Sequence, residues 1–214
     1  YVDGILIRTF KQSDVEALAQ HGDIPIINGL TDIEHPCQIL TDIYTIRQKT
    51  SDWTRCKIAY VGDGNNVANS WLLAAAKLGL NFSMATPSTY SPDPSIIKRA
   101  RNLAEKSGAS LQIGNDPVLA VQGAHVIYTD TWVSMGDENE KQERLSKFKG
   151  FQINVSLLRN ANSGAIVMHC LPAHRGEEIT DEVIDGAQSV VFDQAENRLH
   201  VQKGILAELM GNKS

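Results

Sequence analysis

The sequence predicts an α/β fold built on a mostly parallel sheet with helices on both faces. Short apolar runs typical of buried strands alternate with stretches in which apolar residues recur every three or four positions, as in amphipathic helices. Asp-Pro pairs and glycines mark places where these helices begin and end. Strands that alternate with helices pair in parallel through right-handed crossovers. With 214 residues, of which 42% are hydrophobic, the chain can bury a full core.

The order of the elements follows from these patterns. The expected strands are residues 2–8, 24–28, 57–61, 80–86, 110–113, 126–129, 166–169 and 190–192. The expected helices are residues 13–21, 36–48, 66–78, 94–108, a segment from 117, a solvated one over 138–149, and a terminal one over 196–210. Capping boxes at residues 13–16 and 31–34 are predicted to begin the first two helices. The polar segment 49–55 indicates a boundary, after which a second winding starts.

Composition excludes several classes of protein. The formal net charge of −5 provides no basic surface for nucleic acid, and no apolar run approaches the roughly 18 residues that a membrane helix needs. Three cysteines are too few and too scattered for a disulfide framework, which favours a reducing compartment, the cytoplasm. The chain opens in mid-strand, without an initiator Met or a targeting segment, so we expect its natural start to be missing.

The string His-Cys-Leu-Pro at residues 169–172 is the most informative motif. It closes the buried run 165–168 and is followed by Ala-His-Arg-Gly-Glu-Glu, so a thiol, imidazoles and a guanidinium are expected where a parallel sheet opens its ligand crevice. Nearby positive charge favours either a thiolate or a tightly hydrogen-bonded thiol at Cys170. The alternative is a cysteine buried only for packing.

Polar residues follow two other predicted strands. The string Gly-Asp-Gly-Asn-Asn at 62–66 resembles a dinucleotide fingerprint, but Val67 occupies the place of the third small residue, and adjacent amides suit a zwitterion better. After the strand 126–129, Asp130 and Ser134 offer acceptors for an α-amino group. The alternative is that Asp130 caps a turn and Trp132 covers the core.

Donors for an anion or a carbonyl oxygen occur earlier in the chain. His-Pro-Cys-Gln at 35–38 lies at a predicted helix start, where free backbone N–H groups attract such oxygens, although a helix cap explains the string equally well. Arg8 is either an anion-binding fork or a surface ion-pair partner. The residues His35, Cys37, His169, Cys170 and His174 do not match the ligand spacings of structural zinc, and there is no Gly-x-Ser-x-Gly elbow.

The motifs together resemble a known family. In chain order they are Arg-Thr-Phe at 8–10, His-Pro-Cys-Gln at 35–38, Gly-Asp-Gly-Asn-Asn at 62–66, Asp-Thr-Trp-Val-Ser-Met-Gly at 130–136, His-Cys-Leu-Pro at 169–172 and Glu-Asn-Arg at 196–198. This set closely resembles the ornithine carbamoyltransferases over essentially the whole chain. The strings at 130–136 and 169–172 separate these enzymes from the aspartate branch of the family.

The resemblance implies transfer of a carbamoyl group from carbamoyl phosphate to the δ-amine of L-ornithine, without a metal or organic cofactor. It also implies two α/β domains with the site between them, assembled as trimers or multiples of trimers. The residues that it assigns to carbamoyl phosphate are Arg8, His35, Gln38, Cys170, Leu171 and Arg198. Arg8 and His35 would be directed at the carbonyl oxygen, and with Cys170 they form the implied catalytic set.

On the ornithine side, the resemblance assigns Asn66, Asp130, Ser134 and the backbone of Met135 to the amino-acid end. Cys170 would lie beside the reacting amine and carbonyl, in a polar positioning role, because a deprotonated amine is itself a competent nucleophile. Donors that converge on an oxygen gaining charge in a tetrahedral transition state contribute roughly 2.7–4 kcal/mol each.

The implied domain organisation is the end of a carbamoyl phosphate domain (residues 1–50), a Rossmann-like ornithine domain (51–195) and a terminal helix packed back on the first domain (196–214). The Ser-x-Arg-Thr-Arg phosphate loop of the family does not occur in this sequence. We therefore expect this polypeptide alone to be inactive or nearly so.

Two other functions stay open. Another amine, such as putrescine or an acylated ornithine, could be the acceptor, although Asp130 with Ser134 favours a free α-amino group. A non-catalytic amino-acid-binding module is the alternative from a different class, and it should bind ornithine without carbamoyl phosphate. A nucleotide-dependent dehydrogenase would bind NAD, which we do not expect.

Overall fold

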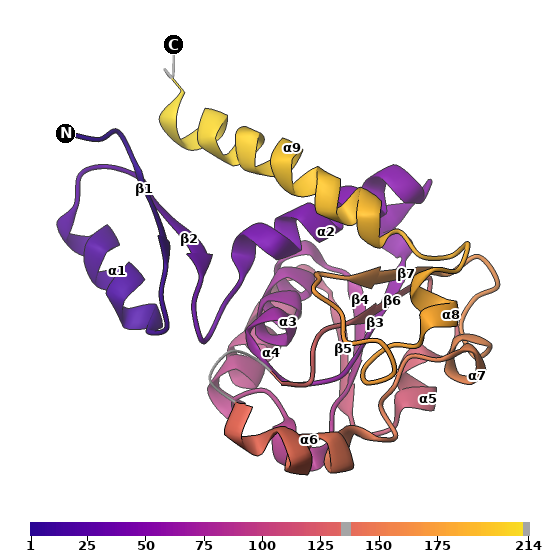
Figure 1. Ribbon diagram of the computed structural model, residues 1–214. Helices are drawn as coiled ribbons and strands as arrows, with labels where there is room; N and C mark the ends of the chain where they lie inside the picture. The colour runs from indigo at the N-terminus through magenta and orange to yellow at the C-terminus, as the bar shows by residue number, and fades with distance from the viewer. Residues whose placement is uncertain (134–137, 212–214) are drawn as a thin grey trace.

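The computed structural model describes residues 1–133 and 138–211 and contains two parallel sheets (Figure 1). The smaller sheet pairs β1 (Ile5–Arg8) with β2 (Ile26–Leu30). The larger sheet has the order β5-β4-β3-β6-β7. Its strands are β3 (Lys57–Val61), β4 (Asn81–Ala85), β5 (Ser110–Gly114), β6 (Val126–Thr129) and β7 (Ile166–His169).

Every neighbouring pair of strands in the larger sheet is parallel, which confirms the predicted fold class. The central strand β3 pairs with β4 on one side and with β6 on the other. The carboxyl ends of all five strands therefore lie at one edge, and the loops after β3, β6 and β7 are neighbours there. This edge is where a doubly wound sheet binds its ligands.

Helices cover both faces of the larger sheet (Figure 1). The helices are α1 (Gln12–His21), α2 (Pro36–Lys49), α3 (Asn66–Leu78), α4 (Pro94–Ser107), α5 (Pro117–Val121), α6 (Lys141–Phe148), α7 (Val155–Leu158), α8 (Asp181–Ile184) and α9 (Val191–Met210), with 3₁₀ turns η1 (Trp53–Arg55), η2 (Ser88–Tyr90) and η3 (Glu138–Glu140). Alternate side chains of β3 pack into two hydrophobic cores, one on each face of the sheet. Ile58 and Tyr60 pack with α2, α3 and α4, whereas Ala59 and Val61 pack with α5 to α8.

The helix stop at Gly79 and the caps at Asp93 and Asp116 are as the sequence predicts, and the structure adds a cap at Asn65. The Asn65 side chain accepts from the backbone N–H groups of Val67 and Ala68 and so caps α3, and Gly79 ends that helix with φ of 71°. Asp93 and Asp116 cap α4 and α5, each followed by a proline at the first helical position. These caps are local, so sequence spacing is enough to find them.

Three local predictions are wrong. Residues 190–192 do not form a strand, because only the bridge between Ser189 and Val167 adds to β7 before α9 begins at Val191. The Thr31 hydroxyl accepts from the N–H of Glu34 in a turn that precedes α2, so it does not cap that helix. Helix α1 begins at Gln12, before the expected capping box, with its first N–H bonded to Asp32.

The charged segment 138–149 is also less solvated than expected. Its helix is only α6, and that helix buries Arg144 and Phe148. Phe148 joins an aromatic cluster with Tyr90, Trp132 and Phe151. The reason is that this helix closes one face of the sheet.

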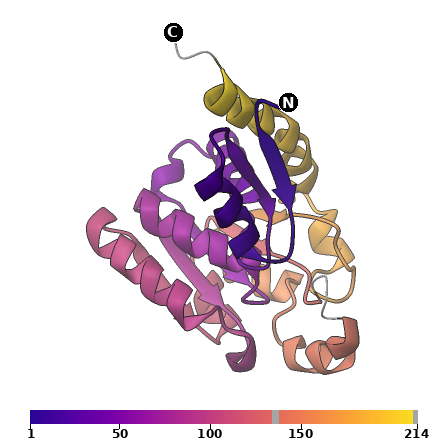
Figure 2. The same cartoon turned by 90° about the vertical axis from the view of Figure 1, so that its left-hand side faces the viewer.

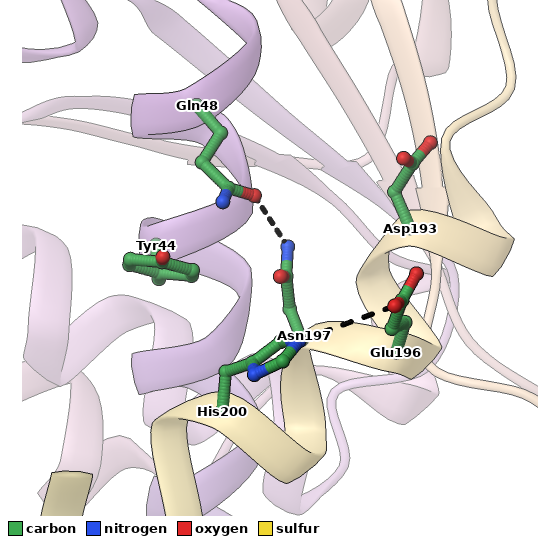
Figure 3. Close-up of a pocket in the computed structure, with 6 residues that line it drawn as sticks. All are labelled: Tyr44, Gln48, Asp193, Glu196, Asn197 and His200. Carbon is green, nitrogen blue, oxygen red and sulfur yellow. Dashed lines mark hydrogen bonds and ion pairs between the residues drawn. The ribbon is translucent and has the colours of Figure 1, made fainter.

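Helices α2 and α9 lie side by side and bring the two ends of the chain together (Figures 1 and 2). Asn197 donates to Thr45 Oγ1 over 3.0 Å and to Gln48 Oε1 over 2.7 Å. A small open pocket on this helix pair is lined by Tyr44, Gln48, Asp193, Glu196, Asn197 and His200 (Figure 3). None of the predicted site residues lines it. Within the described residues, no helix is long and apolar enough to cross a membrane.

Candidate active site

The carboxyl edge of the larger sheet joins a thiol to a carboxylate. Cys170 follows β7 and donates from Sγ to Asp130 Oδ1, which follows β6, over 2.9 Å. Asn65, after β3, donates to Asp130 Oδ2 over 2.8 Å, and the N–H of Thr131 donates to Oδ1 over 2.8 Å. The loops after three neighbouring strands thus supply one polar cluster around the buried Asp130. Asp130 is its acceptor; the role predicted for this carboxylate toward an α-amino group stays a prediction.

Cys170 is a hydrogen-bonded thiol and not a thiolate. Burial and the adjacent Asp130 carboxylate raise the pKa of Cys170 well above its ordinary value. The basic residues that follow it in sequence do not supply the expected positive charge, because Arg175 pairs with Asp181 and Asp185 at the surface. Of the two alternatives that the sequence left open, the geometry selects the tightly bonded thiol.

His169 shapes the turn that carries Cys170 and Leu171. The ring is fully buried, and its Nδ1 accepts from the N–H of Leu171 over 2.9 Å. That bond leaves the proton on Nε2, which lies 3.1 Å from Glu178 Oε1. The turn holds Leu171 in the left-handed region, with φ of 57°. Glu178 also accepts from the N–H of His174 and so ties both sides of the turn together.

Two groups of side chains within the described residues have the spacing of metal ligands. The ligand atoms of Asp130, His169 and Cys170 lie within 4.8 Å of one another, as do those of His174, Glu177 and Glu178. In the first group both ring nitrogens of His169 and the thiol of Cys170 are already hydrogen-bonded. In the second group, His174 Nδ1 lies 3.1 Å from Thr131 Oγ1, Glu177 pairs with Lys141, and Glu178 accepts from the N–H of His174. A metal ion would have to displace these bonds, so neither group is assigned an ion.

His35 stands at the start of α2 and is held there by α3. Its backbone N–H donates to Ser70 Oγ over 2.7 Å, and that hydroxyl donates to the carbonyl of Asn66. Asn66 and Asn69 donate to the carbonyls of the preceding loop, at Thr31 and Ile33. The helix that begins at the sheet edge therefore also fixes the loop that presents His35.

The imidazole of His35 is neutral at pH 7. Its pKa is lowered to about 4: burial is the largest cause, the charges of Arg198 and Arg8 also lower the pKa, and the charge of Asp130 raises it. All three charged groups act on this one ring. These groups come from the first strand, the sheet edge and the last helix, and each affects the pKa of the ring at the start of α2.

His35 makes the protein less stable in acid. Because its folded pKa of about 4 lies below the ordinary 6.5, the unfolded chain takes up a proton first, so stability present above pH 6.5 is lost as pH falls through 4. Lowering the pH from 7 to about 4.5 should reduce the free energy of unfolding of the wild type by about 2 kcal/mol more than that of His35→Gln. Urea unfolding at the two pH values measures this, and equal losses would contradict it.

Gln38 and Arg198 join the two ends of the chain at the site. Arg198 of α9 donates to Gln38 Oε1 of α2, and Gln38 Nε2 donates to Asp42 Oδ1 over 2.8 Å. The guanidinium is thereby oriented by an amide one turn after His35. Both residues are predicted from the sequence, and the structure brings them together.

The remaining predicted residues have different outcomes. Leu171 lies next to Cys170 in the same turn, and the Asn66 amide nitrogen bonds Thr31. Ser134 and Met135 lie outside the described residues. Residues that the sequence analysis left unassigned at this site are Asp42, Asn65, Ser70, Glu178 and Gln194. A partial signal existed for Asn65 and Glu178, which stand inside the quoted motifs.

The fold and the two-sided site define a class of protein. Residues 1–48 match the carbamoyl-P binding domain of the aspartate/ornithine carbamoyltransferases, and residues 54–209 match their Asp/Orn binding domain. The chain belongs to the aspartate/ornithine carbamoyltransferase family.

Its similar relatives are ornithine carbamoyltransferases. Those of Gloeobacter violaceus and Thermococcus kodakarensis are 54% and 56% identical over 213 and 211 residues, which is 100% and 99% of this chain and 68% and 67% of theirs. The structure of ornithine carbamoyltransferase from Pyrococcus furiosus, 52% identical, superposes with a TM-score of 0.95 over 100% of this chain and 68% of that one. The chain therefore spans about two thirds of the length of these relatives.

Proposed function

We propose that this protein transfers the carbamoyl group of carbamoyl phosphate to the δ-amine of L-ornithine and releases L-citrulline and phosphate. The observation that carries the proposal is the hydrogen-bonded Asp130–Cys170 unit at the sheet edge, together with a His35 whose pKa is affected by Asp130, Arg8 and Arg198. We call Arg8, His35 and Arg198 the cationic wall of the proposed site, and Asp130 with Cys170 its acidic wall. The relatives at 54% and 56% identity have the same activity in their names.

Carbamoyl phosphate is assigned to the cationic wall. Arg198 attracts this anionic ligand, Gln38 orients Arg198, and Arg8 is directed at the carbonyl oxygen. The neutral ring of His35 has one N–H group, and that group donates a hydrogen bond to the carbonyl oxygen. The backbone at Cys170 and Leu171 borders the carbamoyl group. These contacts strengthen as the oxygen gains negative charge, which is how preorganised donors accelerate acyl transfer.

Ornithine is assigned to the acidic wall, with Asn66, Asp130, Ser134 and Met135 at its amino-acid end. The deprotonated δ-nitrogen forms a bond to the carbonyl carbon, and the bond from that carbon to the phosphate oxygen breaks with its electron pair. The departing phosphate, a base, takes the proton that the nitrogen loses. Holding both substrates in line supplies much of the acceleration.

Cys170 positions the substrates and is not the nucleophile. Its thiol donates to Asp130 and has a raised pKa, so little thiolate is present at neutral pH. Arg8 and His35 make the catalytic contacts with the carbonyl oxygen. No resident metal or organic cofactor takes part in the proposed reaction.

The organisation and setting of the protein are part of the proposal. We assign residues 1–50 to a carbamoyl phosphate domain, 51–195 to an ornithine domain, and 196–214 to a helix that returns to the first domain. The pairing of α2 with α9 supports this division. A homotrimer or a multiple of trimers, in the cytoplasm, is the proposed assembly; the free thiols of Cys37, Cys56 and Cys170 suit a reducing compartment.

The test is steady-state assay of the natural full-length protein with carbamoyl phosphate and three amines: L-ornithine, putrescine and N-acetyl-L-ornithine. We expect citrulline, and a kcat/KM for ornithine at least about a hundredfold above the other two, because only ornithine offers a free α-amino group and a carboxylate together. Faster carbamoylation of another amine would overturn the substrate assignment. Ornithine binding in calorimetry without any turnover would indicate the non-catalytic module.

A further inference from the structure

A line of buried amide and carboxyl groups runs between α2, α9 and β7. Gln38 and Asp42 lie one turn apart on α2, and Gln194 lies on α9; each is at most 1% exposed. Asp42 Oδ1 accepts from Gln38 Nε2 over 2.8 Å and from Gln194 Nε2 over 2.7 Å. Asp42 therefore joins two side chains that stand 156 positions apart in the sequence (194 minus 38).

Each end of the line contacts a different wall of the proposed site. Gln38 Oε1 accepts from Arg198, on the carbamoyl phosphate side. Gln194 Oε1 accepts from the backbone N–H of His169 over 3.0 Å, immediately before Cys170. The line thus connects the phosphate-side guanidinium to the backbone that carries the thiol.

The chemistry of the groups requires an acceptor in the middle. A glutamine amide has one accepting oxygen and one donating NH₂, and a half turn exchanges them. Both glutamines point their NH₂ at Asp42, which leaves each oxygen for the donor at the far end. Without Asp42, either amide could rotate and direct its NH₂ at Arg198 or at the N–H of His169, where two donors would face each other.

We propose that Asp42, acting through Gln38 and Gln194, is the positioning residue that fixes the two walls of the site relative to each other. The proposal rests on the proposed carbamoyl transfer and adds a role for two residues that touch neither substrate. Burial raises the pKa of Asp42 to about 7, opposed by hydrogen bonds from Gln38, Gln194 and Tyr128 and by the charge of Arg198. Protonated or not, Asp42 retains an oxygen that can accept from both amides.

The test compares two substitutions at Asp42 in the full-length protein. Asp42→Ala removes the acceptor, and we expect it to raise KM for carbamoyl phosphate about tenfold and to lower kcat about tenfold, since both walls lose an oriented group. Asp42→Asn keeps an accepting oxygen, and we expect both constants to stay within about threefold of the wild type. Rescue by asparagine separates an acceptor role from a need for charge.

Thr41→Val is the matched control. Thr41 is equally buried on the same helix and donates to the carbonyl of Cys37, outside the line. We expect this variant to lower the unfolding midpoint while both kinetic constants stay within about twofold. Asp42→Ala kinetics within twofold of the wild type, or Asp42→Asn as impaired as Asp42→Ala, would overturn the proposal.

Gln194→Met tests the other half of the line and serves if Asp42→Ala does not fold. The measurement is hydrogen exchange of the backbone at residues 169–171, with and without carbamoyl phosphate at saturation. In the wild type we expect the ligand to slow exchange there; in Gln194→Met the ligand should bind without that effect. Equal slowing in both proteins would overturn the proposal.

Absence of citrulline from the wild type would instead contradict the proposed function, and the exchange result would still decide the positioning role.

Discussion

Replacing Asp130 with asparagine is expected to lower kcat for citrulline formation about a hundred- to a thousandfold. Among the described residues, Asp130 accepts from three donors, Cys170 Sγ, Asn65 Nδ2 and the N–H of Thr131. An asparagine offers one oxygen to these three donors and turns an NH₂ toward at least one of them. Truncating one partner of a buried, hydrogen-bonded charge costs about 2–5 kcal/mol, and each 1.4 kcal/mol is a factor of about ten in rate.

The substitution also removes the carboxylate from the amine side of the site. The pKa of His35 would then lose the one effect that raises it, so the imidazole stays neutral and the carbonyl-side contacts persist. We therefore expect KM for carbamoyl phosphate to change little while kcat falls. That division of the kinetic effect is specific to a residue that acts on the amine.

Asp116→Asn provides the control for this experiment. Asp116 likewise follows the carboxyl end of a parallel strand, but it is exposed and caps α5 with bonds to Val118 and Leu119. Asparagine caps a helix about as well as aspartate, so its kinetics should equal those of the wild type. A kcat for Asp130→Asn within tenfold of the wild type would remove Asp130 from the reaction.

The sequence specifies most of the fold because its signals are local. The runs at 57–61, 126–129 and 166–169 become β3, β6 and β7 with the predicted bounds, since strands buried on both faces are continuously apolar. Asp93 and Asp116 indicate where their helices begin, because each caps its helix and is followed by a proline. Where tertiary contacts compete, local signals mislead: Val190 and Val191 favour a strand, yet α9 must begin there to reach α2.

The site residues also separate into those that local sequence signals predict and those that depend on contacts between distant parts of the chain. Arg8, His35, Asp130 and Cys170 are predicted because their residue types stand at strand ends or a helix start. Asp42 is missed because its partner Gln194 lies 152 residues away, and no spacing rule links them. The sequence leaves the state of Cys170 open between a thiolate and a hydrogen-bonded thiol, because it shows the basic neighbours but not the carboxylate that accepts from the thiol across the sheet.

Substitution of Arg144 is expected to cause the largest loss of stability. Its side chain is 9% exposed; NH1 lies 2.9 Å from Asp63 Oδ2 and donates to the carbonyl of Trp132, and the guanidinium stacks 4.7 Å from the ring centre of Tyr90. Arg144→Met removes the cationic partner of a buried carboxylate, which costs about 3–5 kcal/mol of unfolding free energy. It also loosens the loops after β3 and β6, which carry Asn65 and Asp130.

The cause can be isolated with a double-mutant cycle measured by urea unfolding. If the loss of the contact between Arg144 and Asp63 dominates, adding Asp63→Asn to Arg144→Met should recover about half of the loss, because the second substitution removes the buried negative charge that Arg144 contacts. Arg175→Met is the matched control: Arg175 also contacts two carboxylates, at 2.7 Å and 2.6 Å, but at the solvent-exposed surface, where water screens the pair, so its loss should be far smaller. Equal losses for Arg144→Met and Arg175→Met would show that burial of the ion pair does not determine its contribution.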